Sequence, residues 1–171
     1  MKKVNCILLL TLLTVCLSGC SGSGQKDVLR DIGRELQLDV SSGVVMSEND
    51  SHGGFHGDGT SYTVIQFEDN SLETAISSAE GWMALPLDET AQILVYGREV
   101  ENGKNGPYLT DEDGTSLIPE VENGYYWLMD RQADEIGKED ESVMLSRPSL
   151  NFTIAIYDSD CKTLHYCEMD T

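Results

Sequence analysis

The sequence predicts an α+β fold: a single antiparallel sheet of about five strands with two to three helices on one face. Two strand-like segments near the N-terminus indicate a hairpin. Three alternating segments near the C-terminus indicate a three-strand meander. Segments with helical periodicity precede the hairpin and separate it from the meander.

The first helix is predicted over Lys26 to Leu38. Its apolar residues Val28, Leu29, Ile32 and Leu36 recur at helical spacing, and charged residues occupy the other face. The hairpin follows, with strands predicted over residues 43–48 and 61–68. A glycine-rich loop of residues 49–60 makes the connection unusually long for a hairpin.

A second helix is predicted from Asn70 to the neighbourhood of Gly81. Asn70 is expected to be its N-cap, with Glu73 completing a capping box. Residues 88–96 predict a further helix that stops at Gly97, although the apolar run 93–96 would also suit a strand. Residues 100–123 are predicted to be a loop, punctuated by glycine and proline.

The meander is predicted from residues 125–131, 151–158 and 162–169. Each segment alternates between two sets of side chains, which is typical of β-strands. Residues 158–161, Asp-Ser-Asp-Cys, have the composition of a tight turn between the last two strands.

The N-terminus has the features of a secretory signal peptide. Lys2 and Lys3 precede an apolar run from Ile7 to Leu17, and small residues precede Cys20. The alternative, an uncleaved transmembrane anchor, is disfavoured because the run is well short of the roughly 20 residues that span a bilayer. The ending Leu17-Ser18-Gly19-Cys20 resembles the lipobox of bacterial lipoproteins.

This resemblance implies that the chain is cut before Cys20 and that the Cys20 thiol carries a diacylglycerol. Residues 1–19 would then be the signal peptide, residues 20–26 a lipidated cysteine with a Gly/Ser-rich tether, and residues 27–171 a single acidic domain. The expected location is the extracytoplasmic side of a cell membrane. Diacylglycerol is the one attached group expected, and no other cofactor is.

The chain is strongly acidic, with 30 Asp and Glu against 11 Lys and Arg. Loss of Lys2 and Lys3 leaves 9 basic residues and a net charge of about −21. Such a charge argues against nucleic acid as a partner and against adhesion to anionic lipid, so the lipid anchor must supply the membrane affinity. It favours solubility, and it permits a cation or a basic partner.

The candidate binding loop holds Asp50, His52, Phe55, His56 and Asp58. Imidazole and carboxylate ligands suit zinc or another transition metal. However, the His-x-x-x-His spacing places both rings on one side only in a helix, and the glycines of this loop oppose a helix. The alternative is a polar hairpin loop whose glycines supply positive φ angles.

A second candidate is Asp111 with Asp113, Gly114 and Glu120, which partly matches a calcium-binding loop. Leu109 would fall on its first ligand position and cannot bind calcium, so an ordinary Asp/Gly turn is preferred. No catalytic motif is present. His165 is interpreted as a strand residue, and Cys161 and Cys167 as free thiols.

The sequence therefore favours a lipid-anchored, non-catalytic binding module with a protein or peptide ligand. The alternative function is a metal- or cation-binding lipoprotein that uses the His52/His56 loop.

Overall fold

The computed structural model describes residues 24–53, 57–101, 103–133 and 141–171. The predicted signal peptide, Cys20, and the first part of the predicted tether lie outside the described residues. So do Phe55 and His56 of the candidate loop. Among the described residues, no helix has the length and apolar character needed to cross a bilayer.

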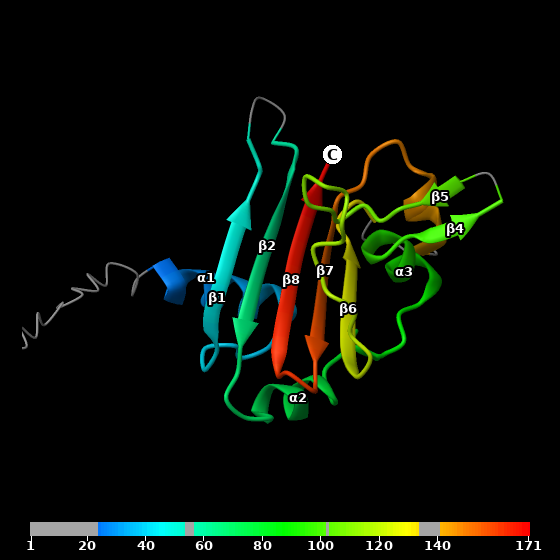
Figure 1. The fold of residues 1–171 in the computed structure, drawn as a ribbon. Helices are drawn as coiled ribbons and strands as arrows, with labels where there is room; N and C mark the ends of the chain where they lie inside the picture. Colours follow the sequence, from blue (N-terminus) through cyan, green and yellow to red (C-terminus); the bar gives the residue numbers. More distant parts are fainter. Residues whose placement is uncertain (1–23, 54–56, 102, 134–140) are drawn as a thin grey trace, which may run out of the picture.

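A six-stranded antiparallel sheet forms the centre of the fold, in the order β1-β2-β8-β7-β6-β3 (Figure 1). Its strands are β1 (Val44–Asp50), β2 (Gly59–Gln66), β3 (Met83–Ala84), β6 (Gly124–Asp130), β7 (Phe152–Asp158) and β8 (Thr163–Asp170). The α+β class, the N-terminal hairpin β1–β2 and the C-terminal meander β6–β7–β8 are confirmed. The extra strand is β3, which has two residues and pairs with β6 at one edge.

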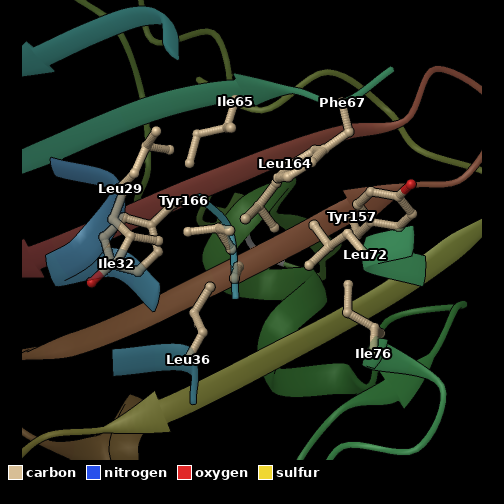
Figure 2. Packing of buried hydrophobic residues seen from close by; sticks show 12 residues of the cluster. Leu29, Ile32, Leu36, Ile65, Phe67, Leu72, Ile76, Tyr157, Leu164 and Tyr166 are labelled. Atoms are coloured by element: carbon tan, nitrogen blue, oxygen red, sulfur yellow. The ribbon is translucent and has the colours of Figure 1, made fainter. Parts of the chain in front are cut away.

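Helices α1 (Gly24–Leu36) and α2 (Ser71–Ile76) cover one face of the sheet. Leu29, Ile32 and Leu36 of α1 pack against Ile65, Leu164 and Tyr166 of the sheet, as Figure 2 shows. Helix α1 begins two residues earlier than predicted, so the last residues of the predicted tether form its first turn.

The opposite face of the sheet is also buried, which the sequence analysis did not anticipate. Phe152, Ile154 and Ile156 of β7 point to this side and are fully buried. Helix α3 (Glu89–Val95), the segment 109–118 and the 3₁₀ helix η1 (Glu141–Ser146) cover them. Strand β7 is therefore apolar on both sides, which explains why its residues from Phe152 to Tyr157 are all buried.

The N-terminal ends of α2 and α3 differ in how they are capped, and the predicted cap of α2 is not formed as expected. In α3, Oδ1 of Asp88 accepts a hydrogen bond from the Ala91 backbone N–H at 2.8 Å, which is the geometry of an N-cap. Asn70 occupies the N-cap position of α2, but its side chain makes no cap hydrogen bond. The predicted capping box is wrong, because Glu73 accepts a hydrogen bond from Ser159 instead.

Residues 100–123 are more ordered than a connecting loop. Strands β4 (Arg98–Val100) and β5 (Gly103–Asn105) pair as a separate small hairpin. Leu109 and Ile118 then enter the core and are almost completely buried. This segment forms part of the layer that covers the second face.

Candidate functional site

The predicted binding loop leaves the sheet between β1 and β2. Ser51 and Thr60 join its two ends: the Ser51 N–H donates to the Thr60 carbonyl at 3.0 Å, and the Thr60 N–H donates to Ser51 Oγ at 2.8 Å. Asp50, His52 and Asp58 are described, and Phe55 and His56 are not. These hydrogen bonds hold the two ends of the loop together, and His52 directly follows Ser51.

His52 lies between two carboxylates. Its Nδ1 is 2.7 Å from Oδ1 of Asp50, and its Nε2 is 3.1 Å from Oδ2 of Asp170 at the end of β8. The other oxygen of Asp170 is 2.9 Å from the Arg131 guanidinium, which also donates to the Met169 carbonyl. Asp50, His52, Asp170 and Arg131 form a row of ionisable side chains across one end of the sheet, from β1 to the end of β6.

The carboxylate of Asp50 is held in its ionised form by this arrangement. It accepts hydrogen bonds from the backbone N–H of His52 and from the ring of His52, and together they lower the pKa of Asp50. The arrangement fixes the ring of His52 and the start of the loop.

Gly59 allows His52 to reach Asp170. It pairs with Asp170 across β2 and β8, and a Cβ atom at Gly59 would lie 2.5 Å from the backbone of His52. Of the three described glycines of the loop, Gly53, Gly57 and Gly59, Gly57 has the predicted positive φ, of +73°. At position 59, glycine is needed because the His52 backbone lies too close for a side chain, and not because of a positive φ.

The described part of the loop does not assemble a metal site. Both ring nitrogens of His52 face carboxylates of the protein itself. Within residues 24–53, 57–101, 103–133 and 141–171, no group of three or more His, Cys, Asp or Glu is arranged to hold a metal ion. Asp58 makes no ion pair or side-chain hydrogen bond with these residues, and His56 itself lies outside the described residues.

The Asp111 segment is a turn, as preferred from the sequence. Oδ1 of Asp111 accepts hydrogen bonds from the backbone N–H groups of Asp113 and Thr115. Gly114 supplies a positive φ of +79°. The Asp111 carboxylate, which matched an inner position of the calcium-binding loop, therefore closes its own turn.

A groove that the sequence analysis missed lies between α1 and the sheet. It has a volume of about 400 Å³, within the range of roughly 300–1,000 Å³ that is typical of small-ligand sites. Its lining comes from α1 and from the facing parts of β1, β2 and β8: Val28, Asp31, Ile32, Arg34, Glu35, Glu48, Asn49, Asp50, Ser61, Thr63, Tyr166 and Glu168.

Acidic side chains dominate this groove. Among its described lining residues, five are acidic and one, Arg34, is basic. Arg34 lies 3.5 Å from Asp31, so its charge is already partly compensated. Glu35 and Glu48 make no ion pair and no side-chain hydrogen bond with any described residue. The groove therefore carries excess negative charge on both walls, α1 and β1.

Two hydroxyl groups in the groove have no hydrogen-bond partner among the described residues. Thr63 is only 5% exposed, yet its hydroxyl makes no hydrogen bond with any of them. The hydroxyl of Ser61, two positions earlier on the same side of β2, likewise makes none. Both hydroxyls line the groove, so each can bond to water or to a ligand atom there.

The sequence did contain a signal for this groove. On the side of β2 that faces α1, Ile65 is completely buried, and Thr63 and Ser61 replace apolar residues towards the loop. A change from apolar to hydroxyl residues along one face of a strand marks the point where the core ends and a polar site begins.

A second cavity, of about 440 Å³, lies on the other side of α1. Its lining includes Leu29, Leu38, Val40, Lys26 and Arg30. Arg30 is paired with both Asp27 and Asp31. This cavity lacks a buried polar side chain without a partner, so the groove is the stronger candidate site.

His165 and Cys167 lie next to each other on the second face of β8. The Tyr62 hydroxyl is 2.8 Å from Nδ1 of His165, and the two rings stack. Burial lowers the pKa of His165 and raises the pKa of the Cys167 thiol. A thiol held in its neutral form is a poor nucleophile. The interpretation of His165 as a packed strand residue and of Cys161 and Cys167 as free thiols is confirmed.

Comparison with known proteins gives no match: no family model fits the chain, and neither a curated protein nor a solved structure is detectably similar to it.

Proposed function

We propose that this protein is a lipid-anchored binding module of the extracytoplasmic side of a cell membrane, and that the groove between α1 and the sheet is its binding site. The observation that carries the proposal is the Thr63 side chain, which belongs to a residue only 5% exposed, lines the groove and makes no hydrogen bond with any described residue. Its hydroxyl is therefore available to a ligand atom, which need not break a hydrogen bond within the protein.

The position of the groove also supports this function. Helix α1 is one wall of the groove, and it begins at Gly24, four residues after the cysteine of the lipobox-like motif. A ligand in the groove would therefore be held close to the membrane anchor. The row of ionisable side chains around His52 lies at the same end of the hairpin, and Asp50 belongs both to this row and to the groove.

A photo-crosslinking experiment tests the binding site. The full-length protein carries a photoreactive phenylalanine derivative at Asn49, which lines the groove and is exposed, or at Glu99 of β4 as the control. After irradiation of the producing cells, a specific adduct is expected at position 49 and not at position 99. Equal labelling at both positions, or none, would contradict the proposal.

The lipid anchor has a separate test. Mass spectrometry of the membrane-extracted protein is expected to find a lipid-modified Cys20 at the N-terminus. A Cys20→Ser variant is expected to be misprocessed or released from the membrane while its unfolding transition stays unchanged. An unmodified chain that still begins at Met1 would remove the anchor from the proposed function.

A further inference from the structure

We propose that the groove between α1 and the sheet binds an alkylammonium ion, meaning a primary ammonium group on an aliphatic stem. A lysine side chain and a free aliphatic polyamine both carry this chemistry. The inference rests on the proposed function, because it names the ligand class of the same site.

The charges of the groove select a cation. Glu35 lies on the α1 wall and Glu48 on the β1 wall, and neither has a basic partner among the described residues. Glu168 lies on the floor at β8, where it accepts a hydrogen bond from the Tyr166 hydroxyl. Carboxylates on three sides of one groove attract a positive charge that enters between the walls.

The unpaired hydroxyls specify the kind of cation. An ammonium group has three donors and no acceptor, so it requires acceptors in several directions. The oxygens of Thr63 and Ser61 can accept such bonds from the floor, while the carboxylates accept from the walls. A hydroxyl without a partner among the described residues would thus gain a charged donor, which makes a stronger hydrogen bond than a neutral one.

The apolar part of the groove suits an aliphatic stem. Val28 and Ile32 lie one turn apart on the side of α1 that faces the sheet, and the Tyr166 ring is almost fully buried beside them. Methylene groups pack on such surfaces while the charged end of the same molecule stays among polar groups.

A divalent metal ion fits this groove less well than an extended organic cation. A metal needs several ligands at one point, and no group of three acidic or imidazole side chains among the described residues is so arranged. The carboxylates are instead distributed along the walls, which matches a ligand that has length as well as charge.

Calorimetric titration of the full chain tests the inference. The probes are cadaverine, spermidine and a blocked tripeptide with a central lysine. The same tripeptide with acetylated lysine, and 1-pentanol, serve as controls without a positive charge. We expect cadaverine or the lysine peptide to bind and both controls to fail. Binding of the peptide alone identifies a polypeptide as the source, and binding of the free amines alone identifies a polyamine.

Variants of the groove locate the binding. Glu48→Gln and Thr63→Val are each expected to weaken binding about tenfold, because the first removes a negative charge and the second removes the hydroxyl acceptor. Thr63→Ser keeps the hydroxyl and is expected to retain most of the affinity. Glu99→Gln is the matched control, since it removes an exposed strand carboxylate far from the groove and is expected to leave affinity unchanged.

The outcomes separate the ligand class from the function. If no amine binds, or if the neutral controls bind as well as the amines, the alkylammonium inference is wrong. A specific crosslink at position 49 would in that case still support a binding module with another ligand. Urea unfolding of each variant shows whether a loss of affinity reflects a loss of folded protein, and equal weakening by Glu99→Gln would also overturn the inference.

Discussion

Nε2 of His52 lies 3.1 Å from Oδ2 of Asp170, although 118 residues separate them in the chain. The contact joins the loop after β1 to the last residue of β8. Asp170 also pairs with Arg131, which follows β6. One carboxylate therefore ties the N-terminal hairpin to the C-terminal meander.

A double-mutant cycle measures this connection. His52→Ala and Asp170→Ala are expected to couple by about 0.5–1 kcal/mol in the free energy of unfolding, because the pair is partly exposed but belongs to a network. Urea denaturation of the two single variants and the double variant gives the value. The matched cycle of His52→Ala with Asp58→Ala should give a coupling near zero, since no contact joins those side chains. Equal couplings in the two cycles would argue against the network.

Substitution of Gly59 should displace His52. In a Gly59→Ala variant the new methyl group would meet the His52 backbone at 2.5 Å. We expect a loss of about 1–3 kcal/mol in the free energy of unfolding, as for other overpacked sites, together with a weaker His52–Asp170 coupling. Gly53→Ala is the control within the same loop, because its nearest neighbouring atom would be 3.9 Å away. If both variants lose the same stability, the close approach at Gly59 has no consequence.

Acid should destabilise the protein through His165. Burial lowers the pKa of His165 in the folded state below its ordinary value of 6.5, so the unfolded chain takes up a proton first as the pH falls. Above about pH 6.5 both states are neutral at this residue, and it has no effect on the pH dependence. Between 6.5 and the folded-state pKa, the free energy of unfolding should fall by at most about 1.4 kcal/mol per pH unit from this residue.

A comparison of wild type and His165→Gln isolates this contribution. Chemical denaturation between pH 8 and pH 5 should give a steeper decline for wild type below pH 6.5. Carboxylates contribute equally to both proteins, so they cancel in the difference. Parallel curves would show that His165 does not titrate differently on unfolding.

The two helix N-caps should respond differently to truncation. Asp88 accepts hydrogen bonds from the Ala91 N–H and from the Tyr126 hydroxyl, so Asp88→Ala should cost about 1–2 kcal/mol. Asn70→Ala should cost less than about 0.5 kcal/mol, because the Asn70 side chain makes no cap hydrogen bond. Thermal or urea unfolding decides, and a larger loss at Asn70 would contradict the geometry.

The strands could be predicted from the sequence because their alternation is local. In residues 152–157, alternate positions of the sequence correspond to the two faces that β7 presents in the fold. The capping box predicted at Asn70 was wrong because its outcome depended on a distant residue. Glu73 accepts a hydrogen bond from Ser159, 86 residues further along the chain. The cover on the second face could not be predicted either, since Leu109 and Ile118 lie in a segment with no regular pattern.

The candidate site depended still more on distant contacts. The loop with His52 could be singled out by composition, but the meeting of His52 with Asp170 requires the pairing of β2 with β8. The groove exists because α1 packs across β1, β2 and β8, and this placement depends on tertiary contacts. Threonine is an ordinary residue in a strand, and Thr63 becomes informative only because it lines the groove and makes no hydrogen bond with any described residue.

Strand β8, which lies between β2 and β7, has a consequence for folding during synthesis. It leaves the ribosome after the other five strands of the sheet, yet it lies in the interior of that sheet. Until residues 163–170 emerge, the hairpin and the first part of the meander have nothing to join them, and β2 and β7 each present an open edge. The sheet therefore closes only after residues 163–170 have emerged, and a chain cut short before Thr163 lacks this central strand.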